Sequence, residues 1–120
     1  MSAQIRNKAL FSSLAATLVF SFSSNVSAVD ADAAKATARQ NGCFKCHAVD
    51  KEKDGPAYSK VAAKFRSNGK TEAENVNRLI THITSGETAK FPDGHEEEHK
   101  IIKTTDKAQI KNLIDWILSL

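Results

Sequence analysis

Apolar residues recur with a helical period in the C-terminal half of the chain, and two amphipathic helices are predicted there. The first opens with Thr71-Glu72-Ala73-Glu74, a capping box of threonine and a glutamate three residues later, and Gly86 ends it. The second begins near Thr105-Asp106. The apolar positions of the first helix follow an i, i+3, i+4, i+7 spacing: Val76, Leu79, Ile80 and Ile83. Those of the second lie on one face, with Trp116 beside them: Ile110, Leu113, Ile114, Ile117 and Leu118.

Two more helices are predicted in the N-terminal half. One covers residues 30–40, an alanine-rich run with aspartates at its positive end and a stop at Asn41-Gly42. A shorter one follows Gly55-Pro56 at residues 58–65. Because no run alternates convincingly with period two, no strand is predicted and residues 87–104 are expected to be irregular. The sequence therefore predicts an all-α fold of three longer helices and a shorter one.

The first 28 residues have the three parts of a secretory signal peptide. Arg6 and Lys8 form a basic start, residues 9–22 an apolar middle, and Val26-Ser27-Ala28 a small-residue cleavage site. That middle is shorter than the stretch of about 20 apolar residues that spans a bilayer. A retained membrane anchor is the alternative interpretation. We expect export, removal of residues 1–28, and one mature domain over residues 29–120 without a membrane span.

Charge and cysteine content limit the classes of function that are expected for this domain. Without Arg6 and Lys8 the 17 basic residues of the chain become 15, against 14 acidic ones, so the mature domain is nearly neutral. A nucleic-acid-binding domain needs a clearly basic face, and that class is not expected. Both cysteines lie in the exported part, where an oxidising compartment also makes a disulfide an option.

The most specific motif is "CFKCH", from Cys43 to His47. C-x-x-C-H is the attachment sequence of c-type haem. Two thiols three positions apart at the start of a helical turn can each add to one haem vinyl group, and the next residue directs its imidazole to the iron. Cys43 and Cys46 are thus predicted as thioether anchors, and His47 as the proximal ligand, of one covalently attached haem c.

Other interpretations of the two cysteines remain open at this point. A disulfide or a thioredoxin-like redox pair would fit an exported CxxC, although such redox pairs usually lie in a βα context and no strand precedes Cys43. A zinc site of Cys43, Cys46, His95 and His99 has the right ligand types. Its gap of 48 residues is far longer than the about 12 to 15 expected between such pairs, and it leaves His47 unexplained.

"GCFKCHAVD" and the sequence after it resemble the short class I cytochromes c of bacterial periplasms. Residues 54–66, "DGPAYSKVAAKFR", are similar to the loop and short helix after the family's attachment site, and "LIDWILSL" is similar to its terminal helix. The resemblance implies a small cytochrome c fold around one haem, a periplasmic location, redox proteins as partners, and a terminal helix that crosses the first. It also implies that the Pro56 carbonyl accepts a hydrogen bond from the His47 ring.

The chain departs from this family at the sixth iron ligand. The family's distal methionine precedes the last helix, but the only methionine here is Met1. Matching the terminal helices through Trp116 puts the methionine position at about His99, one helical turn after His95. We expect His99 as distal ligand, with His95 as second choice and an open or water-bound iron as a third alternative. His82 does not share the apolar face of its helix and is expected to be solvated.

These assignments predict a periplasmic monohaem electron carrier with bis-histidine ligation and no catalytic residues, so an enzyme is not expected. The alternative is a haem-based gas or small-ligand binder whose distal ligand is labile or absent. The acidic run from Glu96 to Glu98 is expected to keep its segment solvated or to face a partner. Seven apolar or aromatic residues are expected to line the core or the haem: Phe44, Tyr58, Val61, Phe65, Ile83, Phe91 and Trp116.

Overall fold

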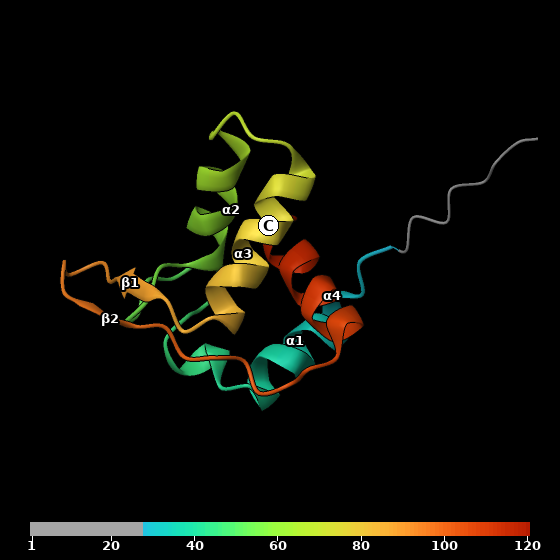
Figure 1. The fold of residues 1–120 in the computed structure, drawn as a ribbon, viewed down its shortest axis with the longest axis horizontal. Coiled ribbons are helices and arrows are strands. Elements are labelled where there is room, and N and C mark those ends of the chain that lie inside the picture. Colours follow the sequence, from blue (N-terminus) through green and yellow to red (C-terminus); the bar gives the residue numbers. More distant parts are fainter. Residues whose placement is uncertain (1–27) are drawn as a thin grey trace, which may run out of the picture.

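The structure, a computed structural model, describes residues 28–120, so the predicted signal peptide lies outside the described residues apart from Ala28. In this part of the chain, four α-helices and a short 3-10 helix form a body from which a two-stranded hairpin projects (Figure 1). The elements in chain order are α1 (Ala31–Gln40), η1 (Cys43–Lys45), α2 (Tyr58–Arg66), α3 (Glu72–Thr84), β1 (Thr88–Lys90), β2 (Glu96–Glu98) and α4 (Lys107–Leu118). The predicted all-α fold of three longer helices and a shorter one is confirmed, with the addition of two short strands. Among the described residues, none of the helices has the length and apolar character needed to cross a membrane.

Side-chain caps set the starts of three helices. The Asp30 carboxylate accepts a hydrogen bond of 2.9 Å from a backbone N–H in the first turn of α1. Asp106 accepts two such bonds, of 2.9 and 3.2 Å, at the start of α4. At α3, Thr71 and Glu74 form the reciprocal capping box that the sequence predicted. Each cap satisfies N–H groups that have no partner inside the helix, so these starts are determined locally.

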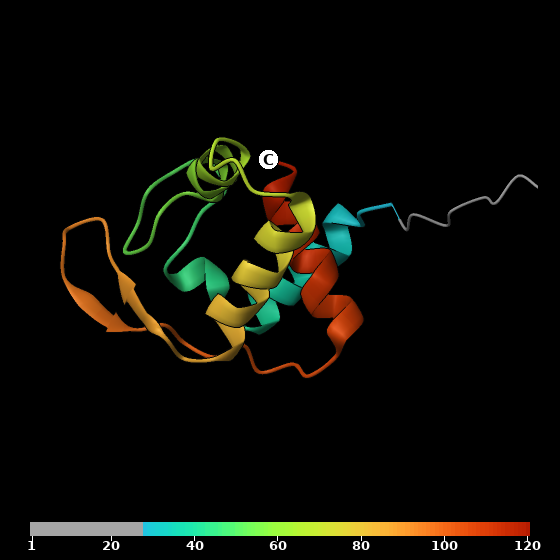
Figure 2. The same ribbon diagram turned by 45° about the horizontal axis from the view of Figure 1, so that its top comes forward.

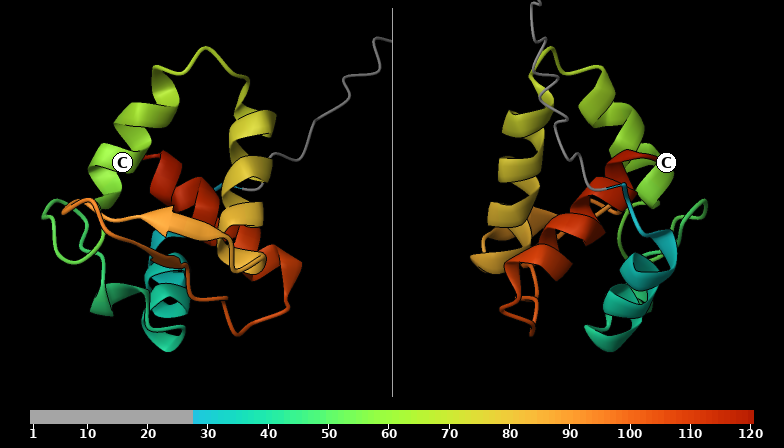
Figure 3. Two further views of the ribbon diagram at one scale, coloured as in Figure 1. Left: turned by 60° about the vertical axis from the view of Figure 1, so that its left-hand side comes forward. Right: turned by 90° about the vertical axis from the view of Figure 1, so that its right-hand side faces the viewer.

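Helix α4 forms the centre of the core and lies between the other helices (Figures 2 and 3). It packs against α1, α2 and α3, and its residues Leu113 and Ile114 are each only 1% exposed. Helix α1 meets α4 through Ala34 and Ala38, which are fully buried. Their small side chains allow the two helices to approach closely, so the first and last helices are in contact as the resemblance implied.

Aromatic side chains extend this core toward the loop that follows α1. The ring of Trp116 meets those of Tyr58 and Phe44 edge-on, with centroids 5.8 and 6.5 Å apart. Such pairs add to the stabilisation from burial alone. Phe91 is an exception to the expected core set, because it lies beyond β1 and its ring stacks on His95 at 4.3 Å. The other expected residues pack against the core: Val61, Phe65 and Ile83.

The expectation of a wholly irregular segment at residues 87–104 is wrong. Strands β1 and β2 pair antiparallel, with Ala89 opposite Glu97 at the centre of the register. The turn between them is closed by a bond of 2.9 Å from the Phe91 N–H to the His95 carbonyl, and Gly94 has a φ of 96° that favours glycine. Strands of three residues, one of them all glutamate and fully exposed, carry no detectable period-two pattern.

Beyond the hairpin, the chain is hydrogen-bonded to the C-terminal ends of α3 and α1 before α4 begins. The Ile102 N–H donates to the Ile83 carbonyl at 2.8 Å, at the end of α3. The Asn41 side-chain oxygen, just after α1, accepts from the N–H groups of Lys103 and Thr104 at 2.9 and 3.1 Å. These bonds fix the course of residues 99–104 across the molecule.

Candidate haem site

The attachment motif folds into a single tight turn. Gly42 has a left-handed φ of 73° and reverses the chain after α1. Helix η1 then carries Cys43, and the His47 N–H donates back to the Cys43 carbonyl at 3.0 Å. The structure therefore brings Cys43, Cys46 and His47 onto one turn of chain, as covalent attachment of a haem requires.

The imidazole of His47 is held on several sides. Its Nδ1 lies 2.7 Å from the carbonyl oxygen of Pro56, and its ring stacks on Tyr58 with centroids 4.9 Å apart and planes 19° apart. A Cβ atom at Gly55 would lie 2.7 Å from Cε1 of His47. No side chain fits at that position, so glycine is required there by the close approach of the ring. Sequence reasoning identified the Gly55-Pro56 turn but missed this contact.

The His99 ring lies near that of His47 and comes from the segment between β2 and α4. The centroids of the two imidazole rings are 6.3 Å apart. Nδ1 of His99 lies 2.9 Å from the Lys100 carbonyl, and the His99 N–H donates to the Glu87 carbonyl at 2.9 Å. In both histidines a backbone carbonyl thus accepts from Nδ1, and Nε2 is the nitrogen left with a lone pair.

The spacing of the two rings is suitable for a metal between them. Metal–imidazole bonds of about 2 Å on either side of one metal place the two ring centres about 6 Å apart. The observed 6.3 Å agrees with this value. A haem iron coordinated by Nε2 of both histidines therefore fits the residues present.

The surroundings also favour the metal-binding form of both rings. Burial lowers the pKa of His47, and the Pro56 carbonyl only partly offsets this effect. Burial likewise lowers the pKa of His99, and the nearby His82 lowers it further. Both imidazoles are therefore neutral at neutral pH, which is the form that binds a metal.

His95, the second choice from sequence, lies in a contrasting environment. It is exposed at the hairpin turn, where Asp93 pairs with its Nδ1 and Glu97 approaches its Nε2 to 2.9 Å. Hydrogen bonds to Asp93 and Glu97 raise the pKa of His95. With a carboxylate at each nitrogen, this ring favours the protonated form, which has no lone pair for a metal.

The expectation that His82 is solvated is wrong. Its side chain is only 26% exposed, and its ring lies 4.4 Å from that of His99. Nδ1 of His82 is 2.6 Å from a carboxylate oxygen of Glu87. These neighbours come from the hairpin and the segment after it, so the periodicity of the helix alone gave no signal for them.

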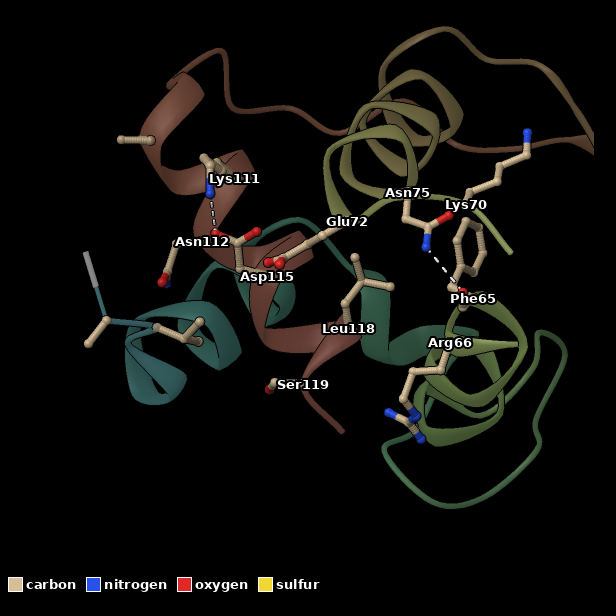
Figure 4. Close-up of a pocket in the computed structure, with 13 residues that line it drawn as sticks. Phe65, Arg66, Lys70, Glu72, Asn75, Lys111, Asn112, Asp115, Leu118 and Ser119 are labelled. Carbon is tan, nitrogen blue, oxygen red and sulfur yellow. Dashed lines mark hydrogen bonds and ion pairs between the residues drawn. The ribbon is translucent and has the colours of Figure 1, made fainter. Parts of the chain in front are cut away.

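Two alternative sites, a zinc or disulfide site at the cysteines and a large surface pocket, lack the features that would make them the functional site. Over residues 28–120 no group of three or more His, Cys, Asp or Glu side chains is arranged to hold a metal ion, and Cys43 and Cys46 do not form a disulfide. A pocket of about 790 Å³ between α2, α3 and α4 is lined by none of the described histidines or cysteines (Figure 4). Its walls carry the ion pair of Lys111 with Asp115.

Comparison with known proteins defines the class. The family model of cytochrome c matches residues 31–120, and the chain belongs to the cytochrome c family. It is a small class I monohaem c-type cytochrome, an electron carrier with one covalently attached haem c.

Several individual proteins are similar to this chain. Cytochrome c-551 of Allochromatium vinosum is 33% identical over 89 residues, which cover 69% of this chain and 81% of that protein. Cytochrome c-552 of Hydrogenobacter thermophilus is 35% identical over 83 residues, covering 69% of this chain and 76% of that protein. The crystal structure of the class 1 cytochrome MtoD from Sideroxydans lithotrophicus ES-1 is 63% identical with a TM-score of 0.68, and covers 77% of this chain and 97% of that one.

Proposed function

We propose that this cytochrome is a periplasmic electron carrier whose haem, anchored at Cys43 and Cys46, has His47 and His99 as its two axial ligands. The observation that carries the proposal is the pair of facing imidazoles, 6.3 Å apart, each with Nδ1 at a backbone carbonyl. The haem supplies one-electron exchange between ferric and ferrous iron. The periplasmic location rests on the predicted signal peptide, and the partners are other redox proteins.

The chain's contribution is to hold both imidazoles in fixed orientations. The Pro56 and Lys100 carbonyls select the tautomer of His47 and His99, leave Nε2 as the coordinating nitrogen and raise the basicity of each ring. Electron transfer then requires little movement of the protein, since a six-coordinate site keeps the same ligands in both oxidation states. No side chain needs to move a proton.

The surroundings of the two candidate distal ligands support His99 over His95. The His99 ring faces His47, whereas both nitrogens of His95 are engaged by carboxylates on the exposed hairpin. For His95 to bind the iron, at least one of those two ion pairs would have to break. His99 needs no such rearrangement.

Ultraviolet to near-infrared spectra of the holoprotein and three variants test this assignment. We expect low-spin bands without the methionine–iron charge-transfer band in the parent protein. His99→Ala should convert the iron to high spin, and the double variant His82→Ala/His99→Ala excludes rescue by the neighbouring ring. His95→Ala is the matched control and should leave the spectrum unchanged. High-spin bands in the parent, or loss of low spin in His95→Ala alone, would refute ligation by His99.

The ligand set also determines the reduction potential. Thioether ligation raises the haem potential relative to imidazole, so a second histidine in place of methionine should make this protein more reducing. An equilibrium redox titration beside a methionine-ligated cytochrome c measures the difference. A potential as high as that of the methionine-ligated protein would contradict bis-histidine ligation.

A haem-based ligand binder is the second candidate, favoured by the position of His99 on a segment outside any helix or strand. Carbon monoxide added to the ferrous protein separates the two functions. Slow or absent binding is expected of the carrier, because His99 must first leave the iron. Fast and complete binding would favour the ligand binder.

A further inference from the structure

His82 occupies the last turn of α3, beside the proposed distal ligand. Its ring centroid lies 4.4 Å from that of His99, and the two planes are inclined by 45°. With 26% of the side chain exposed, the ring is partly shielded from water by its neighbours. The cytochrome c assignment gives this residue no role, since it is neither an anchor nor a ligand.

Glu87 links His82 to His99 in two ways. Its carboxylate lies 2.6 Å from Nδ1 of His82, and the same oxygen lies 2.6 Å from Nη1 of Arg78. Its backbone carbonyl accepts the His99 N–H at 2.9 Å. One residue therefore fixes both the main chain of His99 and the ring that packs against the His99 side chain.

Helix α3 supplies a rigid support for this arrangement. Arg78 and His82 are four residues apart and so lie on one face of the helix. His99 itself belongs to neither a helix nor a strand. The end of α3 meets its ring through His82, with the ring centroids 4.4 Å apart.

We propose that His82, anchored by Glu87 and Arg78, is a positioning residue that fixes the ring orientation of His99 and holds it on the iron. The proposal rests on the bis-histidine ligation proposed above. Each imidazole donates π electrons perpendicular to its own plane, so the angle between the two planes affects the energies of the iron d orbitals. A freed His99 ring would change that angle and would leave the iron more often.

Four variants of the holoprotein test this role by two readouts. His82→Ala removes the ring, and His82→Phe keeps a ring but loses the bond to Glu87. Glu87→Gln leaves the backbone contact to His99 in place. His95→Ala is the matched control, because it removes a histidine that is also bonded to carboxylates. The readouts are the electron paramagnetic resonance spectrum of the ferric protein and the rate of carbon monoxide binding to the ferrous protein.

We expect His82→Ala to shift and broaden the low-spin resonance and to speed carbon monoxide binding about tenfold, the effect of losing one bond and one packing contact. His82→Phe and Glu87→Gln should show smaller changes in the same direction, and they provide the test if His82→Ala does not yield holoprotein. His95→Ala should match the parent.

Two outcomes separate the proposals. A parent protein with a bis-histidine low-spin spectrum and His82 variants identical to it, within about twofold in rate, would overturn the positioning role alone. A high-spin parent would overturn the ligation by His99 and the positioning role together.

Discussion

The proximal and distal sides of the site hold similar imidazoles by different means. His47 is secured within a short stretch of chain: the attachment turn, the Pro56 carbonyl and the Tyr58 ring lie close to it in sequence. His99 depends on Glu87, on His82 and on the bonds of residues 102–104 to α3 and to Asn41. Proximal geometry is therefore a local property, whereas distal geometry requires the whole domain to be folded.

The two sides should also differ in mobility. The Tyr58 ring is 5% exposed and stacks on His47, and Gly55 is buried against the same imidazole. On the distal side the hairpin strands are exposed and short. Segments with few buried contacts open more readily than the core, so the distal histidine is the one expected to exchange.

Breaking the proximal side should have the largest effect. Gly55→Ala would put a methyl group 2.7 Å from Cε1 of His47, and the ring is held by Pro56 and cannot simply move aside. We expect a loss of about 1–3 kcal/mol in the free energy of unfolding and a disturbed haem spectrum. Thermal unfolding and absorption of the holoprotein measure both.

The matched control for this change is Gly69→Ala. Gly69 has a left-handed φ of 73° and open space around it. The substitution should cost about 1–2 kcal/mol through backbone strain alone and leave the haem spectrum unchanged. A normal spectrum in Gly55→Ala would show that the proximal ring tolerates displacement, and the comparison would fail.

Loosening the distal side should have an intermediate effect. Asn41→Ala removes the acceptor for the Lys103 and Thr104 N–H groups and should lower the free energy of unfolding by about 0.5–1.5 kcal/mol, because water can replace part of these bonds at a site that is exposed or part-buried. Because these bonds fix the segment that carries His99, carbon monoxide binding to the ferrous protein should also become faster. Chemical denaturation and stopped-flow absorption are the measurements.

Asn112→Ala is the corresponding control for Asn41→Ala. The Asn112 amide bonds to the backbone of Asp30 at 2.9 and 2.8 Å, and so also links two distant segments. It should lower stability by a similar amount without changing the binding rate. Equal acceleration in both variants would show that the rate follows global stability rather than the distal segment.

The smallest effect is expected at the hairpin turn. Asp93 and Glu97 raise the pKa of His95, so their ion pairs stabilise the hairpin fully below the ordinary histidine pKa of about 6.5. This stabilisation is lost as the pH rises through the raised pKa. Asp93→Asn should lower the pKa of His95, as followed by nuclear magnetic resonance of the ferrous protein, with Asp32→Asn in α1 as the control. An unchanged His95 titration in Asp93→Asn would exclude the ion pair in solution.

The contrast between local and long-range contacts explains which features the sequence could predict. Helix starts were predictable because Thr71, Glu74 and Asp106 cap the residues that follow them. The attachment turn was predictable because its motif, from Cys43 to His47, lies within five consecutive residues. The contact of His82 with His99 was not, since it forms only when the chain after α3 folds back onto that helix.

The close contact at Gly55 and the pairing of β1 with β2 could not be predicted from the sequence either. Gly55 reads as a simple turn residue, and only the structure shows that the His47 ring occupies the space of its missing side chain. Strand β2 consists of three glutamates with low strand propensity, and its pairing with β1 depends on the turn at Gly94. The candidate pair of His99 and His95 could be named from spacing, but the burial of one and exposure of the other could not.

The bond between the His99 N–H and the Glu87 carbonyl closes the base of the hairpin. The residues between Glu87 and His99 form a projecting loop, and the length of this loop does not affect the position of the His99 imidazole. Insertions or deletions near Gly94 would therefore lengthen or shorten the projection while His99 stays in register with His47. The tip is thus a natural attachment point for a tag, an electrode linker or a fused peptide, and also a place where related chains can diverge without changing the iron site.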